Sequence, residues 1–211
     1  SVGTPQNEFY NTFNKAMTSP PSAHVANDFR SRMIEEEPNL TKLPILTHYP
    51  KDPGPYITSG IVSVLDSRRN VENVSVHRML VLDDRHLAIR IVPRHLYRLY
   101  QDAKSRGEKS LGVAIAVGLH PALLLAASAP TPLGVSEYDV ANGLLGGNFS
   151  IVRCSEVDAR APSVAEIVLE GQLLLDREVD EGPFVDLTGT YDVVRKQPVV
   201  RIVKQLLRED Y

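Results

Sequence analysis

The sequence of 211 residues lacks the features that mark several protein classes. Its single cysteine, Cys154, excludes a disulfide framework and a thiolate metal cluster, and it fits a reducing compartment such as the cytoplasm. No apolar run reaches the ~20 residues of a membrane helix, because Gly118, His120 and Pro121 interrupt the longest one. The formal net charge of -3 shows no basic excess of the kind that nucleic-acid binders carry. We therefore expect a protein without a membrane span and without nucleic acid as a partner.

Several common active-site motifs are also absent. The chain contains neither G-x-G-x-x-G nor G-x-x-x-x-G-K-[ST], the glycine-rich loops that hold nucleotide phosphates. It has no G-x-S-x-G nucleophile turn, and its six histidines include no H-x-x-x-H pair for zinc. These absences exclude the common nucleotide-binding loops, a nucleophile elbow and a zinc pair on one helix.

The first quarter of the chain is predicted to be helical. The composition is that of an ordinary globular domain, with 43% hydrophobic and 23% charged residues. Apolar residues at helical spacing predict a helix over 7–17, and a second, more polar helix is predicted over 23–36. A proline-rich connector follows at 44–55. Residues 1–48 are expected to be a helical lead-in that runs into this connector, before a main domain over 49–211.

The main domain is predicted to be rich in strands. Runs of β-branched and apolar residues predict strands over 56–65, 76–82, 86–92, 111–117, 149–154, 164–175, 187–194 and 199–203. Helices are predicted over 94–106, 121–128 and 137–145, the last of them capped by Ser136. Because helices and strands do not alternate regularly, this order favours an α+β fold with a barrel-like or sandwich core.

Three separated residues could form a site for a hard metal ion. Asn73, His95 and Glu137 each lie at the edge of a predicted element. An amide oxygen, an imidazole nitrogen and a carboxylate suit Mn²⁺ or Mg²⁺ better than zinc or copper, especially with phosphate oxygens as further ligands. From spacing alone, a turn asparagine and a first-turn helix glutamate are the commoner explanations of Asn73 and Glu137.

Two acids and an arginine could form a proton-transfer site. Glu181 and Asp186 flank a Gly-Pro turn, and Arg78 lies in an apolar, strand-like run. A guanidinium can clamp carboxylates, and carboxylic acids can carry protons. A solvated acidic turn and an arginine on an exposed strand face are the alternatives at this point.

Six stretches of the sequence match one known family in order and in approximate spacing. They are GPYITSGIV (54–62), NVSVHR (73–78), VPRH (92–95), AVGLHPALLLAASAPTPLGVSEYDVANGLLGG (116–147), APSVAEIVLEG (161–171) and EGPFVDLTGTY (181–191). Together they resemble the UbiD family of decarboxylases over roughly residues 43–211. The resemblance implies a split β-barrel flavin-binding domain with flanking helices, which binds prenylated FMN, Mn²⁺ and a nearby K⁺.

The same resemblance implies roles for individual residues. The metal ligands are expected to be Asn73, His95 and Glu137, and the K⁺ ion is expected at the loop 126–130. The catalytic residues are expected to be Asp186 as proton donor, Arg78 as orienting group and Glu181 as the partner of Arg78. Contacts with the cofactor are expected from Asn73, Ser75, Val76, His77, Arg78, Arg94, His95 and Pro130.

The implied activity is the reversible, non-oxidative decarboxylation of an aromatic or α,β-unsaturated carboxylic acid, the small-molecule substrate. A flavin prenyltransferase would supply the cofactor. The resemblance also implies that residues 1–48 are the remnant of the family's N-terminal region and that the usual C-terminal domain is absent. A separate subunit that carries this domain is therefore an expected partner, and the chain is expected to form a homo-oligomer. Two other functions stay open. They are a non-catalytic flavin-binding subunit that needs a partner chain, and an FMN-dependent oxidoreductase on a split barrel.

Overall fold

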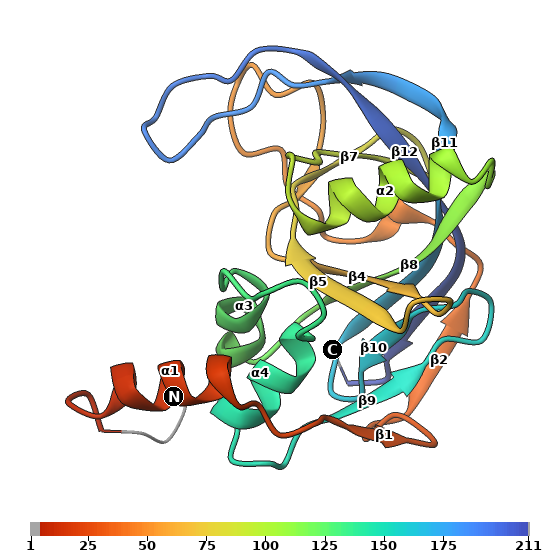
Figure 1. Ribbon diagram of the computed structural model, residues 1–211. Helices are drawn as coiled ribbons and strands as arrows, with labels where there is room; N and C mark the ends of the chain where they lie inside the picture. Colours follow the sequence, from red (N-terminus) through yellow and green to blue (C-terminus); the bar gives the residue numbers. More distant parts are fainter. Residues whose placement is uncertain (1–4, 211) are drawn as a thin grey trace.

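A nine-stranded antiparallel sheet dominates the computed structural model, which describes residues 5–210 (Figure 1). Its strands, in the order in which they pair, are β3 (Tyr56–Ile57), β6 (Met79–Val81), β7 (His86–Ile89), β12 (Arg195–Arg208), β11 (Ile167–Glu181), β8 (Ser110–Val117), β4 (Ile61–Asp66) and β5 (Val71–Val76). β2 (Met33–Glu36) pairs with β12 outside this order. In the described part of the chain the end strands β3 and β5 do not pair with each other, so the curved sheet forms an open barrel.

A smaller sheet and several helices flank the barrel. The small sheet joins β1 (His24–Ala26), β9 (Ser150–Arg153) and β10 (Arg160–Pro162). The helices are α1 (Phe9–Thr18), the 3-10 helix η1 (Leu40–Lys42), α2 (His95–Ser105), α3 (Pro121–Ala127) and α4 (Glu137–Leu144). Figure 1 shows α2 on one side of β4 and β5, and α3 with α4 on the other. The predicted α+β class is thereby confirmed.

The central strands are buried on both faces. In β4, Val62 packs in the same core as α2, whereas the neighbouring Ile61 packs with α3 and α4. In β8, Ile115 faces the first core and Ala114 the second. Successive side chains of a strand point to opposite faces, so a strand covered on both sides has no polar alternation. This double burial explains the continuous apolar run at 111–117.

Two predicted elements are wrong. Residues 23–36 form β1 and β2 rather than a helix, because β2 adds to the sheet through pairs such as Glu36 with Gln205. Pairing with a distant strand overrides local helical preference there. Residues 187–194 form a loop rather than a strand. An isolated bridge between Val185 and Tyr191 closes this loop.

Most other predicted elements are confirmed. The helices predicted over 7–17, 94–106, 121–128 and 137–145 correspond to α1, α2, α3 and α4. β11 and β12 are longer than predicted and pair with each other along most of their length. Leu40 and Leu43 lie in the same core as α2, so residues before position 49 share the core of the barrel. The division into domains at residue 48 stays a prediction.

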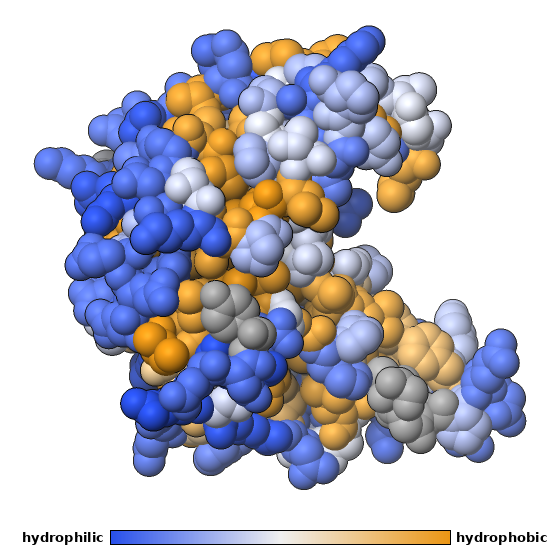
Figure 2. All heavy atoms as spheres, turned by 180° about the vertical axis from the view of Figure 1, so that it is seen from behind, coloured by the Kyte–Doolittle hydropathy of each residue, from blue (hydrophilic) through white to orange (hydrophobic). Residues whose placement is uncertain are grey.

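The molecular surface is polar on one side and apolar around an indentation. Seen from behind, hydrophobic residues extend across the middle of the molecule toward the indented edge, whereas the opposite edge is hydrophilic (Figure 2). None of the helices formed by residues 5–210 has the length and apolar character that a membrane crossing requires.

Candidate active site

A cavity of about 560 Å³ lies where β5, the start of α2 and the connection between α3 and α4 meet. Small-molecule sites typically measure roughly 300–1,000 Å³. The cavity is lined by Asn73, Ser75, Val76, His77, Val92, Arg94, His95, Leu96, Ala127, Ser128, Ala129, Pro130, Thr131 and Glu137. The fold thus brings together the three predicted metal ligands and every predicted cofactor contact except Arg78. Most of the loop predicted for K⁺ also lines this cavity.

Glu137 is the buried acid of the cavity. It begins α4, is only 4% exposed, and its carboxylate accepts hydrogen bonds from the Thr131 hydroxyl at 2.5 Å and the Val74 N–H at 2.7 Å. In the structure, Nδ2 of the Asn73 side-chain amide donates a longer hydrogen bond, at 3.4 Å, to the same carboxylate. Burial raises the pKa of Glu137, and no lysine, arginine or histidine among residues 5–210 forms an ion pair with it. Because a buried carboxylate requires a positive partner or a proton, this position suits a bound cation.

A polar cluster behind the cavity fixes the first turn of α4. The Ser136 hydroxyl accepts a hydrogen bond from the Tyr138 N–H at 3.2 Å and donates one to Glu72 at 2.6 Å. The other oxygen of Glu72 accepts from the Arg160 guanidinium at 2.8 Å. Burial raises the pKa of Glu72, against the opposing effect of Arg160 and Ser136. The predicted Ser136 cap is confirmed, and its link to a buried ion pair holds Glu137 at the cavity wall.

Arg94 and His95 occupy the opposite wall. His95 begins α2, and Arg94 precedes it in an extended conformation. Neither side chain forms a hydrogen bond or an ion pair with another described residue, although both line the cavity. Their donor and acceptor atoms are therefore available to a ligand. Within residues 5–210 no group of three or more His, Cys, Asp or Glu is arranged to hold a metal, so a cation here needs Asn73 and oxygen atoms from a ligand.

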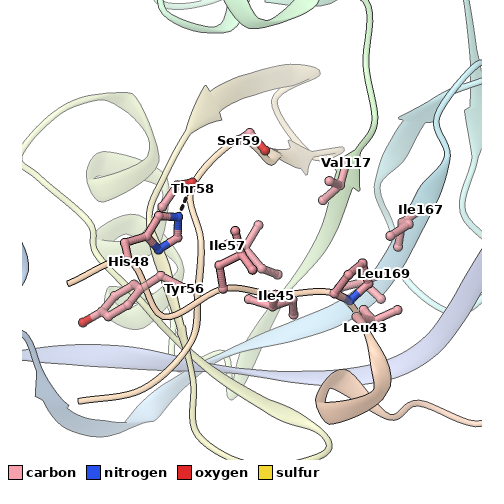
Figure 3. A pocket seen from close by; sticks show the side chains of 12 residues that line it. Leu43, Ile45, His48, Tyr56, Ile57, Thr58, Ser59, Val117, Ile167 and Leu169 are labelled. Carbon is pink, nitrogen blue, oxygen red and sulfur yellow. Dashed lines mark hydrogen bonds between the residues drawn. The ribbon is translucent and has the colours of Figure 1, made fainter. Parts of the chain in front are cut away.

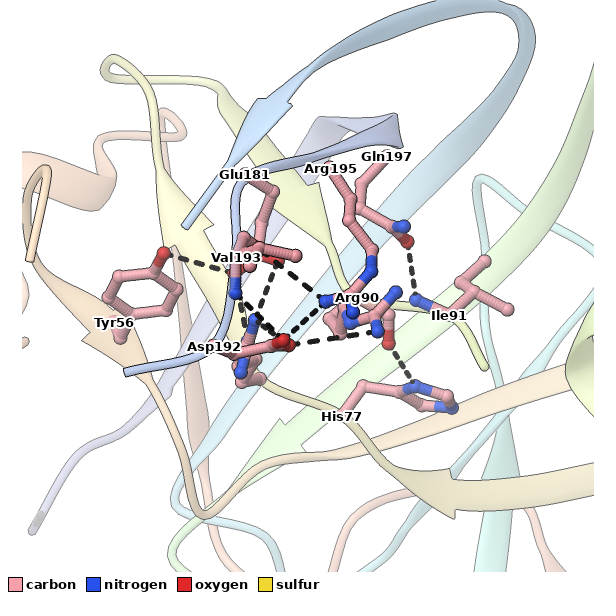
Figure 4. A network of polar contacts seen from close by, with 10 residues as sticks. Tyr56, His77, Arg90, Ile91, Glu181, Asp192, Val193, Arg195 and Gln197 are labelled. Carbon is pink, nitrogen blue, oxygen red and sulfur yellow. Dashed lines mark hydrogen bonds and ion pairs between the residues drawn. The ribbon is translucent and has the colours of Figure 1, made fainter. Parts of the chain in front are cut away.

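A second polar site lies at the end of β11, where Glu181 is fully buried (Figure 4). Arg78 binds the Glu181 carboxylate through two hydrogen bonds, from Nε at 2.8 Å and from Nη2 at 2.9 Å. The Tyr56 hydroxyl donates a third hydrogen bond to it at 3.0 Å. Burial opposes the charged form of Arg78, but the bonds and charge of Glu181 raise the pKa of the guanidinium overall. The predicted pair of Arg78 and Glu181 is thus in direct contact.

Asp192, rather than Asp186, is the second acid that contacts Arg78. Its carboxylate lies 3.3 Å from the Arg78 guanidinium and 3.7 Å from that of Arg90, and Arg195 also binds it. The bond from Arg195, opposed by burial, lowers the pKa of Asp192. Asp192 therefore ties the loop 182–194 to three guanidinium groups.

Asp186 lies elsewhere in the same loop. One carboxylate oxygen accepts hydrogen bonds from the Thr188 hydroxyl at 2.5 Å and the Thr188 N–H at 2.8 Å, and Thr190 adds two longer ones. These bonds lower the pKa of Asp186. Among residues 5–210 no hydrogen bond or ion pair joins Asp186 to Arg78 or Glu181. The role of Asp186 as proton donor stays a prediction.

Tyr56→Phe is expected to destabilise the fold by about 1.5–3 kcal/mol, the contribution of a hydrogen bond to a charged group. The substitution removes a donor from Glu181, which has no access to water. Urea unfolding would measure the loss. Tyr100→Phe is the matched control, because that buried ring has only a 3.4 Å contact with the partly exposed Glu178. Equal losses in the two variants would contradict the prediction.

A smaller, apolar cavity of about 170 Å³ lies between residues 43–48 and the strands β3, β8 and β11 (Figure 3). Its walls are mainly aliphatic, and its polar edge is formed by His48 and Thr58, whose side chains lie 3.4 Å apart. This volume is below the range of typical cofactor sites. The cavity is therefore too small to hold a flavin.

Sequence reasoning missed three residues of the polar network. Tyr56 lies within the run GPYITSGIV but had no assigned role. Arg90 is an arginine in an apolar strand-like run, as Arg78 is, and the rule that a buried arginine must be paired applies to it too. No motif or spacing marks Asp192, because Asp192 reaches Arg78 only when the loop 182–194 folds back toward it.

Comparison with known proteins gives one consistent family. The family model described as "UbiD: 3-octaprenyl-4-hydroxybenzoate carboxy-lyase Rift-related domain" matches residues 22–211. The anhydromevalonate phosphate decarboxylase of Methanothermobacter thermautotrophicus is 49% identical over 172 residues, which cover 82% of this chain and 40% of that protein. A second relative of the same name, from Methanosarcina mazei, is 40% identical over 99% of this chain and 48% of its own length. The chain thus spans less than half of these relatives.

Solved structures agree with the sequence relatives. The UbiD-class enzyme HmfF from Pelotomaculum thermopropionicum in complex with FMN has a TM-score of 0.92 and 36% identity, over 98% of this chain and 47% of its own. An evolved dimeric form of HmfF in complex with prFMN has the same TM-score and identity, over 99% of this chain and 50% of its own.

Proposed function

Because this chain belongs to the UbiD family, we propose that it forms the flavin-binding part of a prenylated-FMN-dependent decarboxylase. The observation that carries the proposal is the buried Glu137, which has no basic partner among the described residues and faces a cavity shared with Asn73 and His95. The names of the two curated relatives favour a phosphorylated α,β-unsaturated acid as substrate over an aromatic acid.

The residues of the cavity fit the implied groups. Mn²⁺ would be held by Asn73, His95 and Glu137, a hard donor set on a buried anionic wall. Arg94, which has no partner among the described residues, suits a phosphate group of the flavin or of the substrate. The loop residues 127–130 would supply backbone carbonyls to K⁺. When bound, prenylated FMN supplies the electron sink that a decarboxylation needs and that amino-acid side chains cannot provide.

The remaining chemistry falls to the second polar site and to Asp186 in the loop that follows it. Asp186 is proposed to deliver a proton to the carbon atom that has lost CO₂, as general acids do. Glu181 holds the Arg78 guanidinium in a fixed plane through two hydrogen bonds. Arg78 in turn stabilises the carboxylate that remains after a nearby acid has given up its proton, and that acid takes up a proton from water before the next turnover.

Mn²⁺ is expected to stabilise the chain by about 2.7 kcal/mol at a concentration of 100 times its Kd. Glu137→Gln should abolish this stabilisation and also make the metal-free protein more stable at neutral pH. The sign follows from the raised pKa of Glu137. The stability that a raised carboxyl pKa provides is fully present below the unfolded value of about 4.3, and it is lost as the pH rises through the folded value. Thermal unfolding with and without Mn²⁺ would measure both effects.

A matched control for this experiment is Glu178→Gln, which replaces an exposed glutamate that does not line the cavity. It should leave the Mn²⁺ response unchanged. Equal Mn²⁺ stabilisation of the wild type and of Glu137→Gln would contradict the metal site.

The activity itself is tested on protein produced together with a flavin prenyltransferase. CO₂ release would be measured with anhydromevalonate phosphate and with a panel of aryl and acrylic acids, and the Methanothermobacter relative would serve as the positive control. Release from the phosphorylated acid alone is the expected result. Retained flavin without CO₂ release would instead favour a non-catalytic flavin-binding subunit. Oxidation of NAD(P)H without CO₂ release would favour an FMN oxidoreductase.

A further inference from the structure

A line of hydrogen bonds runs from a backbone carbonyl outside the cavity to the wall where Asn73 and Glu137 meet. Asn73 and Ser75 lie on the same face of β5, and His77 follows directly after that strand. The Asn73 amide oxygen Oδ1 lies 3.0 Å from the Ser75 hydroxyl, which lies 2.9 Å from Nε2 of His77. The other ring nitrogen, Nδ1, lies 2.8 Å from the Arg90 carbonyl oxygen (Figure 4).

The number of available hydrogens determines which atom donates each of these hydrogen bonds. The Arg90 carbonyl can only accept, so Nδ1 of His77 must carry a hydrogen. Burial lowers the pKa of His77, and a neutral imidazole with its hydrogen on Nδ1 has only an acceptor at Nε2. The single hydroxyl hydrogen of Ser75 is therefore given to His77 and is not available to Asn73.

Donation from Ser75 to His77 determines which atom of the Asn73 amide faces Ser75. With no hydrogen left to donate, the Ser75 oxygen can only accept from Asn73, so the amide NH₂ group rather than Oδ1 must face it. This reverses the amide, whose Oδ1 lies beside Ser75 and whose Nδ2 lies beside Glu137 in the structure, and oxygen and nitrogen of an amide are distinguished only by their hydrogen bonds. In the reversed amide, the oxygen of Asn73 takes the position that Nδ2 has in the structure, 3.4 Å from the Glu137 carboxylate. Two oxygen atoms that face each other in a buried wall repel unless a cation or a proton lies between them.

We propose that His77 is a positioning residue that, through Ser75, turns the amide oxygen of Asn73 toward Glu137 and so completes a divalent-cation site. The inference rests on the cation site proposed above and adds the cause of its geometry. His77 does not touch the cation in this account, since both of its ring nitrogens are engaged. Residues that orient metal ligands in this way typically change metal affinity by about 10–100-fold when they are replaced.

The test is a double-mutant cycle on Mn²⁺ affinity. Mn²⁺ is added to metal-free protein, and electron paramagnetic resonance measures the ion that stays free in solution. His77→Leu removes the acceptor, so the Ser75 hydrogen goes to the Asn73 oxygen and the amide NH₂ faces Glu137. The Mn²⁺ Kd is then expected to rise by about 10–100-fold. In a Ser75→Ala background, His77→Leu should add little further loss, because the line is already cut. His86→Leu, at a histidine whose side chain is bonded to Asp83 of its own hairpin, is the matched control and should leave the Kd unchanged.

Several results would overturn the inference. An unchanged Kd in His77→Leu would do so, and so would a loss of equal size in both backgrounds, which would indicate a purely structural effect. If the wild type binds Mn²⁺ no better than Asn73→Ala does, the proposed metal site fails and the inference fails with it. Nitrogen NMR of the unsubstituted, metal-free protein gives a readout that needs no variant to fold. A hydrogen on Nδ1 of His77 is the expected result, and a hydrogen on Nε2 would overturn the inference even where Mn²⁺ binds.

Discussion

Arg78→Met is expected to destabilise the folded chain by about 3–5 kcal/mol, because it leaves Glu181 buried and without a positive partner. Glu181 is fully buried, and two of its three hydrogen bonds come from Arg78. A carboxylate that water cannot reach must then either stay charged at great cost or take up a proton. Urea unfolding at neutral pH would measure the loss.

The control for this prediction is an arginine pair on the surface. Arg85→Met breaks a 2.9 Å ion pair with Glu37, and both partners are largely exposed, so a loss below about 1 kcal/mol is expected. The double variant Arg78→Met with Glu181→Leu should recover most of the stability, since it removes the stranded charge as well. If Arg78→Met is no more harmful than Arg85→Met, the buried pair does not stabilise the fold as described.

Asp186→Asn is expected to lower the decarboxylation rate by roughly 10²–10⁴-fold, the usual contribution of a general acid. Its effect on stability should be small, because Asp186 is exposed and its bonds stay within one loop. Asparagine keeps the acceptor oxygen for Thr188 but has no acidic proton. Steady-state CO₂ release would measure the rate.

Asp192→Asn tests whether the acid that contacts Arg78, rather than Asp186, is the proton donor. Asp192 binds three guanidinium groups, so its replacement should weaken the attachment of the loop 182–194 and lower stability as well as the rate. Limited proteolysis of this loop would report the attachment directly. Should Asp192→Asn abolish CO₂ release while Asp186→Asn retains it, the proton donor would be Asp192.

The two polar sites differ in how far the sequence alone could predict them. The residues of the cavity come from short runs such as 73–78 and 92–95, and each run carries its side chains to one place because strands and helix starts have fixed directions. The network around Glu181 depends instead on a loop of about a dozen residues. Whether Asp186 or Asp192 meets Arg78 depends on how that loop folds back, which local preference does not determine.

The same contrast applies to the secondary structure. The strands β4 and β8 were predicted from their apolar runs, because a strand that is covered on both faces has no polar positions. The helix predicted over 23–36 was wrong because β2 gains its hydrogen bonds from β12, which lies about 170 residues later.

The sequence by itself determined the α+β class, the helices α1 to α4 and the Ser136 cap, and it predicted a cation site at Asn73, His95 and Glu137. Hydrophobic periodicity and capping residues act within a few positions, so they can be read from the chain alone. Only the tertiary structure decided that Glu137 is buried without a basic partner, that Arg78 meets Glu181 and Asp192, and that His77 reaches the Arg90 carbonyl. Burial and hydrogen-bond partners depend on residues distant in the sequence, and these fix the charge and the orientation of each group.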